Sequence, residues 1–242
     1  MELRSFQSPG AWGVTWEDLS KLDYKQRGLW EYMACVFKLW CRRGVDGFRC
    51  DAGYMVPYEA MEYIVAKVRQ EFPDTIFLLE GLGGKLEVVE RLLSGADLNW
   101  AYSELFQNYD RGQIESYLPG AMAVSATKGA LAHFAETHDN NRLAARSHNY
   151  ASMRTALSAL VSQNGAFGIT NGVEWFADHK IDVHEATPLN WGSSRNQVEH
   201  IARLNCILEL HPAFHPGASL QLIQRGPGNV LVLLRKSPEP LS

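Results

Sequence analysis

Apolar residues recur at helical spacing along much of the chain, and short apolar runs of strand type lie between these segments. From Leu29 to Trp40 the apolar positions keep a helical period, and Gly44 supplies the stop expected at a helix end. Residues 45–51 then read as a short strand, and the apolar positions from Met61 to Phe72 predict a second helix. The first third of the chain is therefore predicted to be helix, strand, helix.

The same alternation continues through most of the remaining sequence. We expect further strands at 75–80, 98–103, 131–136 and 166–170, and further helices around Leu86–Leu93, Ile114–Leu118, Met153–Val161 and Val198–Leu208. Strands that alternate with helices predict a parallel sheet, so the expected fold class is α/β.

The carboxyl end has a different pattern. Residues Ser219–Gln224 and Val230–Arg235 are two β-rich runs separated by a turn that contains glycine and proline. We therefore expect an α/β domain over 1–216 and the beginning of a β domain, cut short, over 217–242.

Composition and charge exclude several classes of protein. Of 242 residues 46% are hydrophobic, and 23 Lys plus Arg face 27 Asp plus Glu, giving a net charge of −4 without a basic run. Nucleic acid is therefore not an expected partner, and no apolar stretch has the length of a membrane span. The four cysteines lack zinc-site spacing, so we expect reduced core thiols and no metal. Residues 1–10 lack the continuous apolar stretch of a secretory signal, so a cytoplasmic location is expected unless a leader is missing.

Acidic residues stand at the ends of three predicted strands. They are Asp51, Glu80 and Asp139. In parallel α/β folds the catalytic groups lie at the carboxyl ends of strands, although a single carboxylate there can also be an N-cap. Arg49 lies two residues before Asp51, on the same face of its strand, where it could keep Asp51 ionised.

Paired carboxyl groups are what glycoside hydrolysis requires, because one attacks the sugar carbon and the other protonates the departing oxygen. The stretch Gly47–Ala52, the strand that ends at Glu80, and the pair His138–Asp139 resemble three of the four signature regions of the α-amylase family, glycoside hydrolase family 13. Further stretches look like parts of that family: residues 16–19, 22–24, 164–174 and 211–214.

This resemblance implies a (β/α)8 TIM-barrel type of fold that is incomplete. The matching residues correspond to barrel strands four to eight, about five β/α units, followed by the start of the family's C-terminal β domain. The first signature region has no counterpart, and calcium ligands near it are also missing, so no metal is expected. Tyr54 and Met55 stand where the family has a lysine and histidine pair, which leaves substrate specificity open.

The resemblance also implies roles for the three acids. Asp51 would be the nucleophile, Glu80 the general acid and then general base, and Asp139 a stabiliser of the distorted sugar. Arg49 would hydrogen-bond Asp51, and His138 would bind a sugar hydroxyl, unless it is an ordinary loop histidine.

Other residues have weaker signals. Arg142 could contact the sugar on the leaving side or be a solvated cation at a helix start. Trp100, Trp175 and Trp191 could stack on sugar rings, but burial is the commoner fate of tryptophan.

The expected function is retaining hydrolysis or transglycosylation of α-glucans or maltooligosaccharides by double displacement, without a cofactor. We expect a fragment with low activity alone, for which a second polypeptide or a second copy could complete the barrel. One alternative is a catalytically silent domain that binds a glucan or a partner. Another, a sugar-phosphate isomerase, would rest on residues 81–84, which fall short of a phosphate-binding loop.

Overall fold

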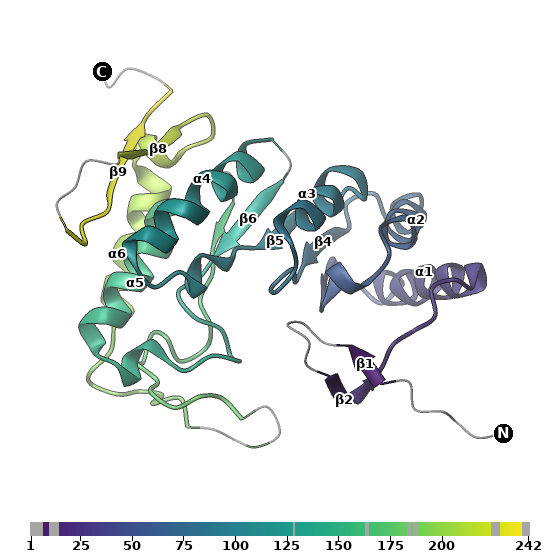
Figure 1. Cartoon of the computed structure of the whole chain (residues 1–242), viewed down its shortest axis with the longest axis horizontal. Coiled ribbons are helices and arrows are strands. Elements are labelled where there is room, and N and C mark those ends of the chain that lie inside the picture. The colour runs from purple at the N-terminus through teal and green to yellow at the C-terminus, as the bar shows by residue number, and fades with distance from the viewer. Residues whose placement is uncertain are drawn as a thin grey trace. The chain divides into compact units, whose positions relative to one another are not determined.

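The computed structural model describes residues 7–9, 15–127, 129–162, 165–182, 185, 188–223 and 228–238. The chain divides into two compact units, Met1–Tyr102 and Ser103–Ser242, and each is described by itself (Figure 1). The predicted boundary between residues 216 and 217 does not coincide with this division and stays a prediction.

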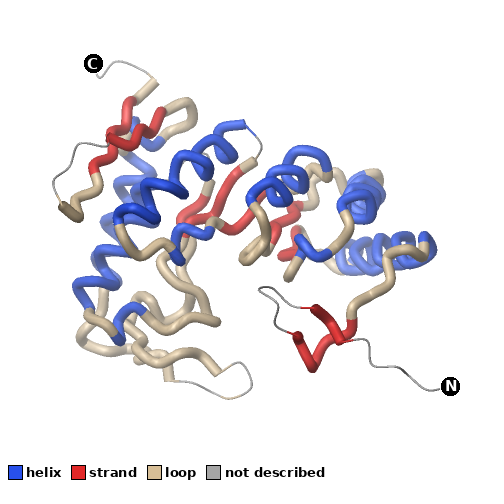
Figure 2. The backbone as a smooth tube through the Cα atoms, in the orientation of Figure 1, coloured by secondary structure: helices blue, strands red, loops and turns tan. Residues whose placement is uncertain are grey.

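The first unit alternates helices with parallel strands (Figure 2). Strand β3 pairs with β4, and β4 with β5, all in parallel, while the short strands β1 and β2 form a separate antiparallel pair. The elements are β1 (Gln7–Pro9), β2 (Thr15–Ser20), α1 (Arg27–Arg42), β3 (Gly47–Cys50), α2 (Tyr58–Arg69), β4 (Ile76–Leu79), α3 (Leu86–Gly95) and β5 (Trp100–Tyr102), with a 3₁₀ turn at Gly53–Met55.

Aromatic packing fixes α1 against the sheet of the first unit. The ring of Phe37 on α1 meets Phe48 of β3 edge-on, with centroids 4.7 Å apart, and Phe77 of β4 at 5.7 Å. The strands approach closely at Gly47, where a Cβ atom would come within 2.9 Å of the Ile76 carbonyl oxygen. Glycine is therefore required at the start of β3 for this pairing.

The second unit also contains parallel strands, because β6 pairs with β7. Its regular elements are α4 (Arg111–Thr127), β6 (Ala130–His133), α5 (His148–Val161), β7 (Ala166–Phe167), α6 (Val198–Leu210), β8 (Ser219–Ile223) and β9 (Val232–Lys236). Short 3₁₀ turns occur at Glu104–Gln107, Leu143–Ala145 and Pro212–Phe214.

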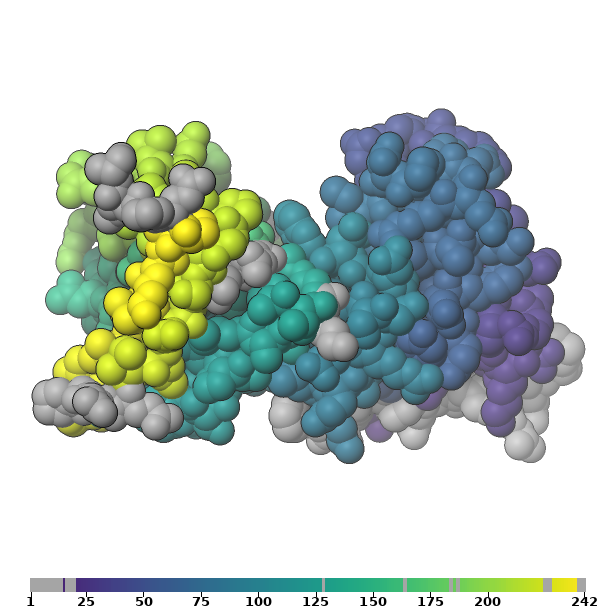
Figure 3. Space-filling model, turned by 90° about the horizontal axis from the view of Figure 1, so that it is seen from above, coloured from purple at the N-terminus to yellow at the C-terminus, as the bar shows by residue number. Residues whose placement is uncertain are grey.

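The predicted hairpin is present, since β8 and β9 pair in antiparallel fashion. Its inner face joins the core of the second unit, where Leu220 packs with Leu105, Ile114, Leu118 and Val161. The guanidinium of Arg235 donates hydrogen bonds to the carbonyl oxygens of Leu160, Ser162 and Ala213. Strand β9 lies at the surface, yellow in Figure 3, and the side chains of Val230, Val232 and Leu234 are exposed.

The structure confirms the α/β class and the five expected parallel strands. It differs from the expectation in four main places. Helix α4 continues through Pro119 to Thr127, although proline removes a helical hydrogen bond. Strand β6 ends at His133 rather than Glu136, β7 ends at Phe167 rather than Thr170, and the β1–β2 pair was not predicted.

Within the part of the chain that the structure describes, none of the helices has the length and apolar character needed to cross a membrane.

All four cysteines are free thiols, but only two of them fit the expectation of core residues. Cys41 is buried and Cys50 is half-buried, whereas Cys35 and Cys206 are exposed. Burial raises the pKa of the Cys50 thiol to about 11, which leaves very little reactive thiolate near neutral pH.

This difference predicts a labelling pattern. Iodoacetamide at pH 8 should alkylate Cys35 and Cys206 and leave Cys41 and Cys50 unmodified in the native chain, as read by peptide mass spectrometry. Labelling in urea should modify all four and serves as the control. Rapid native labelling of Cys50 would contradict its burial.

Candidate active site

Two of the predicted catalytic acids, Asp51 and Glu80, directly follow neighbouring strands at matching positions in the register. In the register of the first sheet Cys50 lies beside Leu79, and the next backbone bond runs from the Glu80 N–H to the Cys50 carbonyl oxygen at 3.0 Å. Asp51 and Glu80 therefore follow directly on paired residues. Neighbouring strands are about 4.8 Å apart, so these two residues start from backbone positions with a spacing that suits one small substrate.

Asp51 is held on one side and open on the other. The Arg49 Nη1 donates a hydrogen bond to Asp51 Oδ1 at 2.5 Å, the contact that the family resemblance implied. The Arg49 guanidinium also lies over the ring of Tyr102, 5.5 Å from its centroid. The Asp51 side chain remains 73% exposed, so a ligand can approach its carboxylate.

Glu80 has the opposite environment. The residue is only 8% exposed, and its two carboxylate oxygens accept hydrogen bonds from the backbone N–H groups of Ala52 and Leu82, each at 2.9 Å. Burial raises the pKa of Glu80, and the negative charge of Asp51 adds to this, although the two N–H bonds and Arg49 oppose it. The raised pKa agrees in direction with a group that must carry a proton near neutral pH.

The backbone turns sharply between the two acids. Ala52 has φ 43° and ψ 35°, the left-handed conformation that costs a residue with a Cβ about 1 to 2 kcal/mol. The N–H of Ala52 also donates the hydrogen bond to Glu80 Oε2. The peptide unit that follows Asp51 is therefore also a hydrogen-bond partner of Glu80, and one local turn positions both carboxyl groups.

The opposed environments of the two acids give a titration prediction. We expect the Glu80 carboxyl, followed by ¹³C NMR, to titrate above the ordinary glutamate range. Asp51→Asn should lower that pKa because it removes a nearby negative charge, and Arg49→Met should raise it because it removes a positive one. Glu71, an exposed carboxylate whose pKa is lowered by Arg42, is the internal control and should titrate below Glu80 in every variant. A Glu80 pKa at or below the ordinary value would contradict this picture.

The second unit carries the remaining predicted residues. His138 and Asp139 lie in the loop after β6, both exposed, with His138 Nε2 at 3.3 Å from Asp139 Oδ2. The Asp139 side chain is 74% exposed. Its loop is braced by Thr137, whose hydroxyl oxygen accepts a hydrogen bond from the Asp139 N–H at 3.2 Å and bonds the Asn140 side chain.

Arg142 is placed differently from the expectation. Its side chain has no exposed surface, so in this structure it cannot contact a sugar or act as a solvated cation. Its Nε donates to Glu136, and its Nη2 donates to the Asn171 carbonyl oxygen at 2.9 Å. The other Glu136 oxygen accepts the Leu143 N–H at 2.7 Å. The buried pair joins both ends of the His138–Asp139 loop to the segment after β7.

Glu136 is the residue that sequence reasoning missed here. It was assigned to a strand, but it turns inward after β6 has ended, and burial raises its pKa despite the neighbouring Arg142. The only sequence signal of this ion pair is its spacing: Glu136 and Arg142 are six residues apart and flank His138–Asp139.

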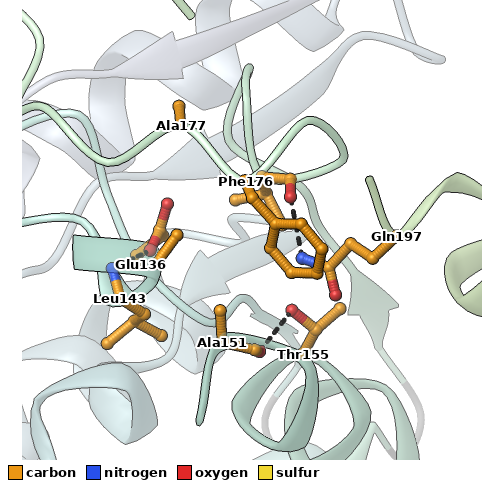
Figure 4. Close-up of a pocket in the computed structure, with 9 residues that line it drawn as sticks. Glu136, Leu143, Ala151, Thr155, Phe176, Ala177 and Gln197 are labelled. Carbon is orange, nitrogen blue, oxygen red and sulfur yellow. Dashed lines mark hydrogen bonds between the residues drawn. The ribbon is translucent and has the colours of Figure 1, made fainter. Parts of the chain in front are cut away.

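Figure 4 shows the pocket beside this pair, where Glu136, Leu143 and Phe176 converge with Gln197. The Gln197 Nε2 donates to the Val173 carbonyl oxygen at 2.7 Å. The pocket has no room for a water molecule, so it is packed core that supports the loop and not a ligand site.

A wider opening of about 960 Å³ lies between α5 and the β8–β9 hairpin of the second unit. Its walls are mainly apolar, and Asp110 is the one carboxylate among its lining residues. A site that lacks a second carboxylate does not suit a reaction that needs two.

The predicted residues thus form two groups. Arg49, Asp51 and Glu80 lie together in the first unit, and His138 and Asp139 lie together in the second. Arg142 is buried and does not join the second group; it positions the His138–Asp139 loop through its bond to the Asn171 carbonyl oxygen.

Comparison with curated proteins finds relatives named alpha-1,4-glucan:maltose-1-phosphate maltosyltransferase. The protein of Methylacidiphilum infernorum is 24% identical over 92% of this chain and 35% of its own length. That of Rhodospirillum rubrum is 22% identical over 84% of this chain and 31% of its own length. The chain therefore spans about a third of the length of these relatives. No protein-family model matches it.

Solved structures agree on the fold. An alpha-amylase from Lactobacillus plantarum has a TM-score of 0.71 and 23% identity, and the match covers 92% of this chain and 56% of that one. The alpha-amylase from H. orenii has a TM-score of 0.74 and 17% identity, over 93% and 55% of the two chains. These likenesses show the fold: parallel β/α units of an incomplete (β/α)8 barrel, followed by the antiparallel β8–β9 pair.

Proposed function

We propose that this chain belongs to the α-amylase family, glycoside hydrolase family 13, and carries the catalytic acids of a retaining α-glucan hydrolase or transglycosylase. One observation supports this above the others: an exposed Asp51 paired with Arg49 stands beside a buried Glu80 whose pKa is raised. Double displacement needs one carboxylate that attacks and a neighbouring carboxyl group whose pKa is raised enough to donate a proton, and this pair agrees with that need in geometry and in the direction of the Glu80 shift.

In the proposed reaction the Asp51 carboxylate attacks the anomeric carbon of a glucose unit. The bond from that carbon to the glycosidic oxygen breaks, and the proton of Glu80 passes to the departing oxygen. A water molecule or a sugar hydroxyl then attacks the glycosyl ester, Glu80 takes its proton, and Asp51 is released with net retention at the anomeric carbon. Water gives hydrolysis, and a sugar gives transfer.

Three other residues complete the proposal. Asp139 stabilises the distorted sugar, His138 binds one of its hydroxyls, and Arg49 holds the Asp51 carboxylate in place through its hydrogen bond. Arg142 takes a positioning role, through its bond to Glu136, in place of the substrate contact first expected.

The substrate class is proposed from the relatives, whose name specifies an α-1,4-glucan. The structure describes five parallel strands in its residues, where a complete (β/α)8 barrel has eight, and the chain spans about a third of the relatives' length. We therefore propose that a second polypeptide or a second copy completes the barrel. The free thiols fit a cytoplasmic location, and we propose residues 217–242 as the start of a β domain.

Incubation of the 242-residue chain with maltoheptaose tests the proposal. We expect new oligosaccharides or glucose units, each released in the α-configuration as read by ¹H NMR before mutarotation. Products with the β-configuration would contradict the retaining mechanism. Binding of maltoheptaose without any turnover would favour the alternative of a catalytically silent glucan-binding domain, for which the open five-stranded sheet is the supporting observation.

A further inference from the structure

The loop between β7 and α6 presents a tryptophan to solvent. Trp191 is 80% exposed, more than any other large hydrophobic side chain in the part of the chain that the structure describes. Leaving an indole in water forfeits the burial of a large apolar surface, which tryptophan normally gains on folding. The position therefore calls for a physical reason other than packing.

The backbone on either side of Trp191 is constrained rather than loose. Asn190 has φ 54° and Gly192 has φ 77°, so the indole is carried between two residues in the left-handed region. The Asn190 side chain donates to the Phe176 carbonyl oxygen at 2.9 Å, and the Ser193 N–H donates to the Asn190 carbonyl oxygen at 2.9 Å. Strain that surrounding hydrogen bonds maintain is typical of functional positions.

The partner segment is constrained in the same way. Phe176, which receives the Asn190 bond, has φ 53°, and its ring stacks on His148 with centroids 4.2 Å apart. Trp175 precedes it and backs the exposed indole, with ring centroids 5.5 Å apart and planes tilted by 43°. The exposed ring is thus supported from behind, while its outer side stays open.

Polar groups that suit hydroxyls lie next to this ring pair. Asp178 is partly exposed, and its Oδ1 accepts from His179 Nδ1 at 2.8 Å and from the Asn190 amide at 3.4 Å. Asp178 thus contacts the residue that precedes Trp191, and a flat apolar surface with a carboxylate and an imidazole nearby matches a sugar ring. The C–H bonds on one face of the sugar pack on the indole, and its hydroxyls bond the polar edge.

The loop also belongs to the same end of the sheet as the His138–Asp139 loop. Strands β6 and β7 are parallel, so the segments after them leave from the same edge, and Arg142 bonds the Asn171 carbonyl oxygen at the start of the β7 loop. A sugar bound at the ring pair would therefore occupy the side of the second unit that carries Asp139.

We infer that Trp191, backed by Trp175, is a stacking site for a glucose ring of an α-glucan chain, separate from the ring that reacts. This inference rests on the proposed function for the identity of the ligand. Its structural basis, an exposed and braced indole with a polar edge, is independent of the catalytic acids.

Calorimetric titration of the full chain with maltoheptaose tests this site. Trp191→Ala should weaken binding at least about tenfold, because the loss of a stacked ring is an effect of that order. Trp191→Phe should retain affinity within about threefold, since a flat aromatic surface remains. Thermal melting of both variants should match the parent chain because the side chain is exposed.

Trp40→Ala is the matched control, since Trp40 on α1 is 45% exposed and lies in the other unit. It should bind maltoheptaose as the parent chain does. Any of four results would overturn the inference. Trp191→Ala could bind as tightly as the parent chain, Trp40→Ala could lose as much affinity as Trp191→Ala, or the parent chain could fail to bind. The fourth is that Trp191→Ala changes only the oligomeric state of the chain.

The outcome is distinguishable from a failure of the proposed function. Asp51→Asn should bind maltoheptaose but not turn it over. Binding that depends on Trp191 without turnover by the parent chain would uphold the stacking site and contradict catalysis. Turnover that depends on Asp51, with affinity indifferent to Trp191, would do the reverse.

Discussion

Asp51→Asn is expected to lower the turnover of maltoheptaose at least about 10⁴-fold, the scale seen when an enzyme loses its nucleophile. Asparagine keeps the size of the side chain but cannot form the glycosyl ester. The Asp51 side chain is largely exposed and accepts a hydrogen bond from Arg49, so the fold should persist. Initial rates at saturating maltoheptaose, with the melting temperature of each variant, give the comparison.

Glu80→Gln separates the two roles. Maltoheptaose cleavage should fall about 10² to 10⁴-fold because no proton reaches the departing oxygen. With α-maltosyl fluoride the first step should be far less affected, since fluoride leaves without protonation, whereas Asp51→Asn should abolish reaction with both substrates. Equal losses on both substrates in Glu80→Gln would contradict its assignment as the acid.

Asp46→Asn is the matched control for the nucleophile. Asp46 is an exposed aspartate just before β3, at the opposite end of the strand from Asp51. Its replacement should leave the rate within about twofold of the parent chain, as for surface substitutions generally. A comparable loss in Asp46→Asn would mean that the effect reflects charge or stability and not chemistry at the strand end.

Arg142→Met is expected to lower the free energy of unfolding by about 3 to 5 kcal/mol, the usual cost of removing one partner from a buried ion pair. Glu136 would stay buried next to an apolar side chain, with only the Leu143 N–H as a partner for its carboxylate. Urea denaturation followed by circular dichroism measures the change.

Two variants calibrate this result. Arg203→Met breaks an exposed i, i+4 pair with Glu199 on α6 and should cost less than about 1 kcal/mol. The double variant Glu136→Gln with Arg142→Met should lose less free energy of unfolding than the two single variants lose together, because it leaves no buried charge. A loss below about 1 kcal/mol in Arg142→Met would show that the pair is not a determinant of the second unit's stability.

The alternation of helices and strands was predictable because its signals are local. Gly44, for example, follows α1 with φ 91°, the conformation that a glycine stop supplies. The acids Asp51 and Glu80 were predictable for a related reason. Strand polarity alone places residues that follow parallel strands at one edge, and the register confirms this for the pair.

The parts that sequence reasoning missed depend on contacts between distant residues. In the sequence the apolar run of β6 continues to Ala135, next to Glu136, but the strand ends at His133 and Glu136 pairs with Arg142 instead. Arg142 itself resembles a surface cation until Glu136 and the Asn171 carbonyl are placed around it. For Trp191 the error would run the other way. Tryptophan is usually buried, and the exposure of this one depends on the hydrogen-bonded loop that carries it.

The left-handed turn at Ala52 limits how this site can be redesigned. Glycine at position 52 would adopt the same backbone without steric cost, whereas a β-branched residue such as valine would resist it and pull the N–H away from Glu80. To change the pKa of Glu80 without replacing either carboxylate, one would therefore substitute Ala52, whose N–H bonds Glu80 and directly follows Asp51.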